Sequence, residues 1–136
     1  MKVKWANSDF DHLHKRISSV LEAEISEAMS RSAEAVAEEA RADAPDEVVN
    51  SIQVEEASAY EPAKVIADDS AAFRLHEMPE FQVTPSPREQ ASMSGGIGPK
   101  FLERPAFALS KRIEKHLMES VKNKLEGKAS PSFKRN

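Results

Sequence analysis

The fold is decided by residues 9–44, which read DFDHLHKRISSVLEAEISEAMSRSAEAVAEEARADA. Apolar side chains recur there at every third or fourth position, as they do along one face of a helix. This face consists of Phe10, Leu13, Ile17, Leu21, Ile25, Ala28, Ala35 and Val36. Ser8 or Asp9 can cap the start of the helix, and the Ala44-Pro45 step ends it because proline pushes the preceding residue out of the helical region. At 1.5 Å per residue the helix is about 50 Å long, so we expect part of it to project from the domain or to pack on another subunit.

The segments that follow predict a small antiparallel sheet. In VVNSIQVEE, at 48–56, Ile52 and Val54 alternate with polar neighbours, and KVIAD at 64–68 is a second β-branched run. The turn-rich ASAYEP between these runs indicates a β-hairpin. A brief edge strand can form in FQV at 81–83.

A short helix and a long loop are expected next. The helix runs through SAAFRLHE at 70–77 and can be capped by Asp68, Asp69 or Ser70. We expect its inner face to hold Ala72, Leu75 and His76. Residues 78–99 contain four of the eight prolines and three of the four glycines, which predicts a flexible loop. In an assembly protein such a loop is suited to ordering against a neighbouring copy.

A second long helix closes the pattern. Pro105 suits its first turn, and Gly127 marks its end. Between them the apolar positions recur at a strict spacing of four: Leu109, Ile113, Leu117, Val121 and Leu125. We expect KASPSFKRN, at 128–136, to be a mobile basic tail unless a partner holds it.

Length and composition suit one domain. A chain of 136 residues, 40% of them hydrophobic, can build a single modest core. We therefore predict an α+β assembly domain over residues 1–127, in which a long N-terminal and a long C-terminal helix flank a small antiparallel sheet made of a hairpin and a short strand. The sequence has no cysteine and no run of about 20 apolar residues, which excludes disulfides and predicts no membrane span. The N-terminus MKVKWANSDFDH lacks the apolar stretch of a secretory signal.

The charge is divided unevenly along the chain. Residues 1–99 hold 9 basic and 19 acidic side chains, whereas residues 100–136 hold 10 and 4. Opposite fields on one small domain favour head-to-tail association between copies, and a solvated basic tail is the alternative. The basic end could also meet phosphates, which allows non-specific contact with DNA.

Several short motifs, taken together, resemble those of neck, tail-completion and minor tail proteins of long-tailed bacteriophages. AAFRLHEM at 71–78 is followed after a loop by GGIGPKFLERPAFALSKRI at 95–113. The second string is similar to the family's entry into its last helix through Pro99, Phe101, Leu102, Arg104, Pro105 and Ala106. Upstream, Ala44-Pro45 and Asn50-Ser51-Ile52 are similar to the family's helix end and strand entry. The chain departs from the pattern by having Val48-Val49 in place of Gly and Leu, and Met78 in place of Gly.

This resemblance implies a virion structural protein of the head–tail junction. Such a protein forms a homomeric ring, with a hexamer favoured, between the connector or adaptor and the tail tube or tail terminator. It is assembled in the host cytoplasm and contacts no membrane. An alternative function is a small cytoplasmic helical binding module whose long N-terminal helix pairs with a partner helix.

Candidate contacts with other subunits lie at the start and along the length of the last helix. Phe101 sits in extended chain between two prolines, where it can anchor the loop on the core or contact a neighbouring subunit. The full candidate set is Phe101, Arg104, Lys111, Arg112 and Lys115.

The sequence lacks patterns typical of enzymes and metal sites. His12 and His14 lie two positions apart on a helix and diverge, and the adjacent pair His76-Glu77 is likewise expected to face apart. GGIG at 95–98 lacks the Lys-Ser/Thr of a phosphate loop. A run of glutamates predicts a solvated helix face: Glu22, Glu24, Glu27, Glu34, Glu38 and Glu39. We therefore expect no enzymatic activity, no cofactor and no metal.

Overall fold

The computed structural model describes residues 7–58, 61–77, 97–98 and 100–135, with side chains from residue 15 onward. In chain order its elements are α1 (Asn7–Asp43), the 3-10 turn η1 (Val49–Ser51), β1 (Ile52–Glu55), β2 (Lys64–Ala67), α2 (Ala72–His76) and α3 (Glu103–Leu125). The predicted α+β class, the two long helices and the hairpin are confirmed. The predicted strand at 81–83 lies outside the described residues, as does the predicted loop apart from residues 97–98.

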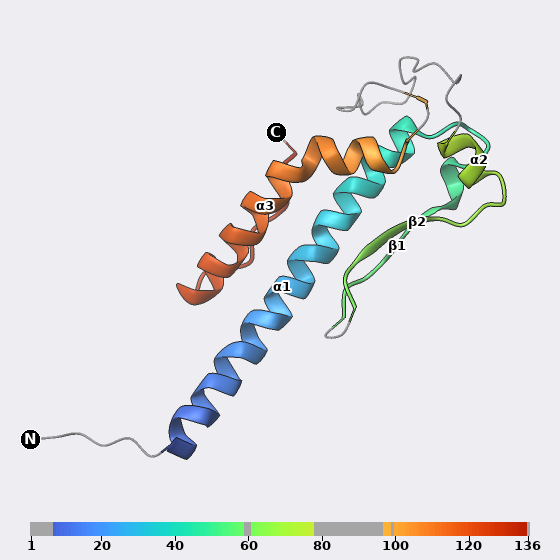
Figure 1. Ribbon diagram of the computed structural model, residues 1–136. Coiled ribbons are helices and arrows are strands. Elements are labelled where there is room, and N and C mark those ends of the chain that lie inside the picture. The colour runs from blue at the N-terminus through green and yellow to red at the C-terminus, as the bar shows by residue number, and fades with distance from the viewer. Residues whose placement is uncertain (1–6, 59–60, 78–96, 99, 136) are drawn as a thin grey trace, which may run out of the picture.

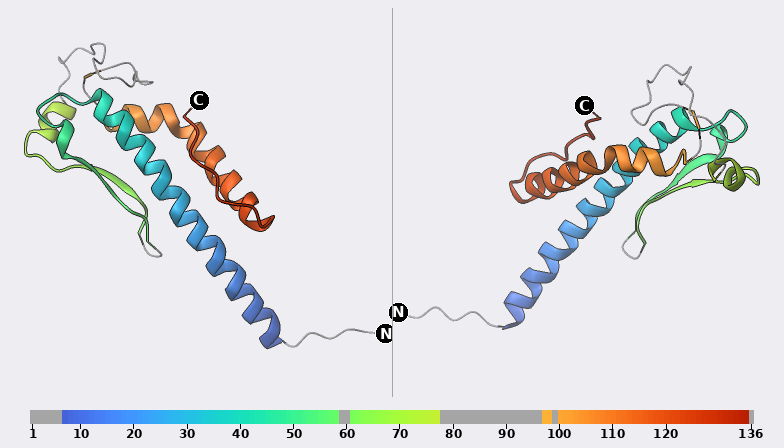
Figure 2. Two further views of the ribbon diagram at one scale, coloured as in Figure 1. Left: turned by 180° about the vertical axis from the view of Figure 1, so that it is seen from behind. Right: turned by 45° about the horizontal axis from the view of Figure 1, so that its top comes forward.

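Helix α1 is the axis of the molecule. Helix α3 lies along one side of its C-terminal half and the hairpin lies along another side, so both pack on α1 (Figure 1). The N-terminal turns of α1 extend beyond both of them in every view (Figure 2). The predicted projection of the helix is therefore present.

The position of the hairpin depends on apolar residues that alternate with polar ones along its strands. Strands β1 and β2 are antiparallel, and their register pairs Ile52 with Ala67 and Val54 with Val65. Ile52 is buried in the core, while its neighbour Gln53 is exposed. The period-two alternation in the sequence thus directs one face of the hairpin toward α1.

The main core forms where the apolar stripe of α1 consists of small residues. Ala37, Ala40 and Ala44 are fully buried, and they pack with Val48, Ile52, Ala72, Leu75 and Phe101. Alanines allow neighbouring elements to approach the helix axis closely, which larger side chains would prevent. The hairpin, α2 and the start of α3 therefore gather around the alanine-rich half of α1.

Contacts between the end of α2 and the residues just before α3 position Phe101. The backbone N–H of Lys100 donates to the carbonyl of His76 at 2.8 Å, and the Lys100 backbone has a positive φ of 56°. The His76 ring meets the Phe101 ring edge-on, with 5.1 Å between centroids. Phe101 is fully buried in the chain's own core, so the interpretation of Phe101 as a subunit contact is wrong and the anchor interpretation holds.

The side chains of His76 and Glu77 do not face apart, contrary to expectation. Their Nδ1 and Oε1 atoms lie 2.9 Å apart. Glu77 directly follows the last residue of α2, and its backbone leaves the helical conformation. Its side chain can therefore point back toward His76. The ammonium of Lys100, which donates to the other oxygen of Glu77, and then the His76 ring lower the pKa of the Glu77 carboxyl.

We expect Phe101→Ala to lower the free energy of unfolding by about 3–5 kcal/mol, because it leaves a cavity in the main core. The matched control is Phe107→Ala on the same helix, where the ring is 80% exposed; it should change stability by less than about 0.5 kcal/mol. Urea unfolding followed by circular dichroism measures both. Equal effects of the two substitutions would contradict this placement of Phe101.

Candidate assembly surface

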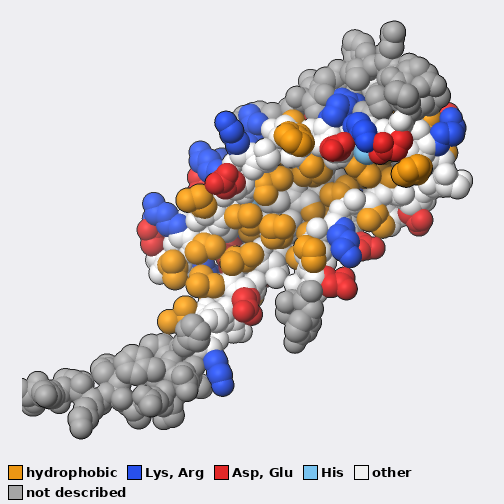
Figure 3. Space-filling model, in the orientation of Figure 1, with side chains coloured by type: hydrophobic (Ala, Val, Ile, Leu, Met, Phe, Trp, Pro, Cys, Tyr) orange, Lys and Arg blue, Asp and Glu red, His pale blue; other side chains and the backbone are white. Residues whose placement is uncertain are grey.

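Five exposed large apolar side chains lie on α1 and on the C-terminal half of α3, with exposed fractions of 47% for Ile17, 47% for Val20, 42% for Ile25, 67% for Met118 and 66% for Leu125. Two more, Phe73 on α2 and Phe107 near the start of α3, are each 80% exposed and are not part of this group. Figure 3 shows orange side chains spread over this side of the molecule. We refer to the group of five, together with the half-buried Leu21, Leu117 and Val121, as the apolar surface.

The apolar surface has two parts. The first, the groove, is an open hollow of about 560 Å³ between the helices, lined by Ile25, Leu117, Met118, Val121 and Leu125. The second, the arm, is the N-terminal part of α1, residues 7–21, which presents Ile17, Val20 and Leu21. A second hollow of about 450 Å³ joins the arm to the groove at Leu125. The two parts are therefore continuous.

A difference in helix length accounts for the exposure of the arm. Helix α1 has 37 residues and α3 has 23, so at 1.5 Å per residue α1 is about 20 Å longer. The apolar stripe predicted from the sequence continues along α1 past the point where α3 ends. Of the large residues in this stripe, Ile17 and Ile25 are exposed, whereas Ala28, Ala35 and Val36 are buried.

Basic side chains border the groove on α3. Lys111, Lys115 and Lys122 are exposed and share one helical face with Met118 and Leu125, because these positions alternate spacings of three and four. Two of the candidate contacts, Lys111 and Lys115, thus lie on the surface, where Lys115 pairs with Glu119 one turn along α3 at 3.8 Å. This ridge gives the apolar surface a positive edge.

The remaining basic candidates are partly engaged within the chain. Arg112 is half-buried and lines a hollow of about 120 Å³ with His116 and Lys134. Arg104 forms an ion pair with Asp43 at 3.7 Å, and the Asp43 carboxylate is fully buried. Arg104 therefore stabilises the junction of α1 and α3 and is not a free contact.

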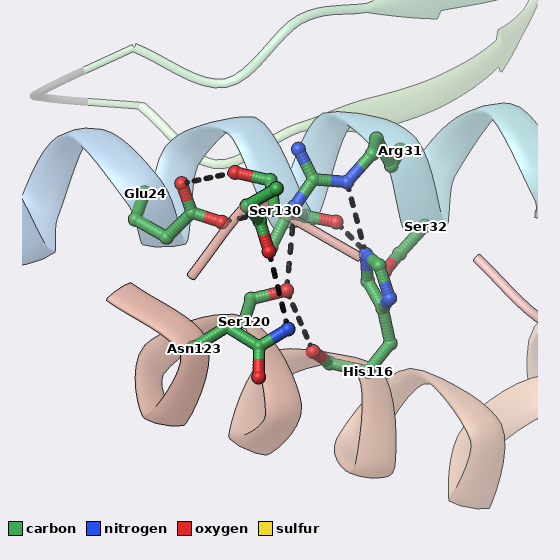
Figure 4. A network of polar contacts seen from close by, with 9 residues as sticks. Glu24, Arg31, Ser32, His116, Ser120, Asn123 and Ser130 are labelled. Carbon is green, nitrogen blue, oxygen red and sulfur yellow. Dashed lines mark hydrogen bonds and ion pairs between the residues drawn. The ribbon is translucent and has the colours of Figure 1, made fainter. Parts of the chain in front are cut away.

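A polar cluster joins α1 to α3 beside the groove (Figure 4). Arg31 donates from Nε to His116 Nε2 at 3.1 Å, and from its Nη2 to Glu24 at 3.2 Å and to Ser120 at 3.3 Å. Ser120 in turn donates to the carbonyl of His116 at 2.7 Å. Glu24, His116 and Ser120 are buried, so the guanidinium of Arg31 compensates the Glu24 charge inside the helix pair. The sequence analysis did not predict this cluster. The pattern that could have indicated it is a pair of polar residues one or two turns apart beside each apolar stripe.

The C-terminal segment packs against the same cluster. The hydroxyl of Ser130 donates to Glu24 at 3.0 Å, and the Phe133 ring meets the His116 ring with 5.2 Å between centroids. Arg135 pairs with Glu38 at 2.9 Å and also with Glu39. The expectation of a mobile tail therefore differs from the structure, because one aromatic ring and one guanidinium fix residues 128–135 on the domain.

Two of the six glutamates predicted to be solvated are buried. Glu24 is 2% exposed and Glu39 is fully buried. Each has a guanidinium partner, Arg31 for Glu24 and Arg135 for Glu39. Helical spacing placed these carboxylates on the contact face of α1, and only the fold supplied the arginines that make burial possible.

The imidazole of His116 is held neutral by its surroundings. Burial lowers its pKa, and the nearby Arg31 charge lowers it further. The hydrogen bond requires the same state, since Nε2 must be unprotonated to accept from Arg31. Protonation of His116 would therefore break a contact between α1 and α3 and set two cations against each other.

We expect the protein to lose stability as the pH falls below about 6.5, the ordinary pKa of histidine. Above that pH the His116 ring is neutral in both the folded and the unfolded chain, so its full contribution to the free energy of unfolding is present. Below it the unfolded chain binds a proton that the folded chain resists, so the free energy of unfolding falls. His116→Gln keeps an acceptor but does not titrate, so it should lack this part of the pH dependence. Urea unfolding between pH 8 and pH 5 measures both profiles, and parallel profiles would contradict the prediction.

Within the described ranges, no three histidine, aspartate or glutamate side chains gather closely enough to hold a metal ion. No helix in this part of the chain combines the length and apolar character that crossing a membrane requires. Comparisons of the chain with protein-family models, with curated proteins and with solved structures found no match.

Proposed function

We propose that this chain is a structural protein that assembles with copies of itself into a ring at the head–tail junction of a long-tailed bacteriophage. The observation that carries self-assembly is the apolar surface on α1 and α3. Isolated exposed apolar residues are common, but a contiguous patch of several large ones marks a protein interface. Burial of such residues contributes about 25 cal/mol per Å² of apolar area removed from water.

The charges on the two helices favour contact between α1 of one copy and α3 of another. Helix α1 carries nine acidic and four basic side chains, whereas α3 carries three acidic and six basic ones. Such complementary fields steer association and fix orientation more than they add affinity. Two different surfaces that recognise each other around a closed rotation generate a ring.

The position in a phage particle rests on the order of the sequence motifs. Each motif contributes to the same core: Pro45 is buried at the end of α1, Ile52 begins β1, Leu75 lies in α2, and Phe101 precedes α3. The motif residues therefore perform one joint structural task, which supports treating them as a set. The ring, its connector and tail-tube neighbours and its place in the virion neck follow from this resemblance.

The mass of the purified protein distinguishes this proposal from its main rival. A ring protein should form a discrete complex of more than two copies, visible by native mass spectrometry and as rings by electron microscopy. A binding module whose partner helix belongs to another protein should remain monomeric at all concentrations.

The phage assignment needs its own experiment. Genes for portal, capsid and tail-tube proteins should lie beside this one. Deleting it from the phage genome should leave heads and tails unjoined, and supplying it from a plasmid should restore infectious particles. Normal joining without the protein would refute the head–tail assignment while leaving self-assembly open to its own test.

We expect Lys111→Glu with Lys115→Glu to slow assembly and weaken its salt dependence, because this double variant reverses the exposed ridge on α3. The matched control is Lys64→Glu with Arg74→Glu, which changes the net charge equally at exposed positions on β2 and α2. Mass distributions at low and high salt measure the effect, with circular dichroism to confirm folding. Equal behaviour of the two double variants would exclude a role for the ridge in steering.

A further inference from the structure

We propose that the arm of one copy lies in the groove of the next copy, so that α1 serves two α3 helices; this rests on the proposed self-assembly. Along its C-terminal half α1 packs on the α3 of its own chain, where Ala35 and Val36 meet Leu109. Along its N-terminal half it presents Ile17, Val20 and Leu21, beside which only the last residues of that α3, Lys124 and Leu125, lie. The neighbouring copy supplies a second α3 for this half.

The arm packs on its own chain only near the end of α3. In proteins most of the stability of a helix comes from packing of its apolar face and not from intrinsic propensity. Of the described α3 residues, Lys124 and Leu125 at its end are those that line the hollow beside Val20 and Leu21. The large apolar residues of the arm, whose burial would stabilise the helix, are about half exposed in the single chain.

The groove is suited to receive a helix. Its two walls are α1 and α3, and its lining residues Ile25, Leu117 and Val121 leave an open apolar hollow of about 560 Å³. A third helix laid between two packed helices buries its own apolar stripe against both. The arm offers such a stripe, since Ile17, Val20 and Leu21 stand at spacings of three and four.

The helix pair within each chain favours a second copy as the occupant, because α1 and α3 already pack together there. The charged residues that line the groove are Lys122 and Glu126, and Lys111 and Lys115 continue the face of Lys122 along α3. The arm carries two acidic residues, Asp9 and Asp11, and two basic ones, Lys15 and Arg16, so it enters the groove without net charge. The chain therefore supplies both a projecting apolar helix and a complementary place for it.

The arrangement can be tested by crosslinking because the chain has no cysteine. One variant carries Val20→Cys on the arm, and a second variant, of different mass through a tag, carries Met118→Cys on the groove. The two are mixed, allowed to assemble and treated with a short bis-maleimide, which tolerates a shift of about one helical turn. The matched control replaces Met118→Cys with Phe73→Cys on α2, whose ring is 80% exposed and lies outside the apolar surface.

We expect the Val20→Cys and Met118→Cys pair to yield severalfold more mixed covalent dimer than the control pair. A second measurement uses Ile17→Asp with Val20→Asp, which should weaken association by about tenfold or more because two charged groups would enter an apolar contact. Phe73→Asp should leave association unchanged. Circular dichroism confirms that each variant is folded.

The outcomes separate the arm contact from the proposed function. Oligomers that form without the mixed crosslink, and that tolerate both aspartates, would overturn the arm contact while leaving self-assembly standing. A chain that stays monomeric at every concentration would overturn both. The mixed crosslink in a complex of only two copies would support the arm contact and refute the ring.

Discussion

Close packing against the alanine-rich half of α1 is the constraint on which the rest of the structure depends. Ala37, Ala40 and Ala44 are fully buried, and the small size of their side chains brings the hairpin, α2 and the start of α3 close to one helix. Phe101 supplies the bulk that these alanines lack, filling the space between them, Leu75 and Ile52. The core is thus one large aromatic side chain packed between the alanines of α1 and the aliphatic side chains of Ile52 and Leu75.

This arrangement assigns different tasks to the two halves of α1. The C-terminal half holds the domain together, whereas the N-terminal half carries Ile17, Val20 and Ile25 to the surface. Large apolar residues in a folded chain normally occupy the core, and a contiguous exposed group of them marks a place for a partner. On α1, the surface on which the proposed self-assembly rests therefore lies on the half outside the main core.

Polar contacts add specificity to the helix pair. Two carboxylates on the contact face of α1, Glu24 and Glu39, are buried only because Arg31 and Arg135 reach them. Removing one partner of such a pair leaves a buried charge without compensation, which is strongly destabilising. The C-terminal segment supplies Arg135, Ser130 and Phe133 to these contacts, so it belongs to the fold. These contacts depend on pH because the hydrogen bond that Arg31 donates to His116 requires a neutral imidazole.

The sequence by itself determined the elements, because they depend on local periodicity and on backbone constraints. The three-to-four spacing predicted both long helices, Ala44-Pro45 ended the first, Gly127 ended the last, and the alternation at Ile52 and Val54 predicted the hairpin. Only the tertiary structure decided which apolar residues are core and which are surface, since the stripe of α1 looks continuous in the sequence and its burial depends on where α3 ends. It also decided that His116 meets Arg31 across 85 positions of the chain, because contacts between distant segments follow from packing and leave no local pattern.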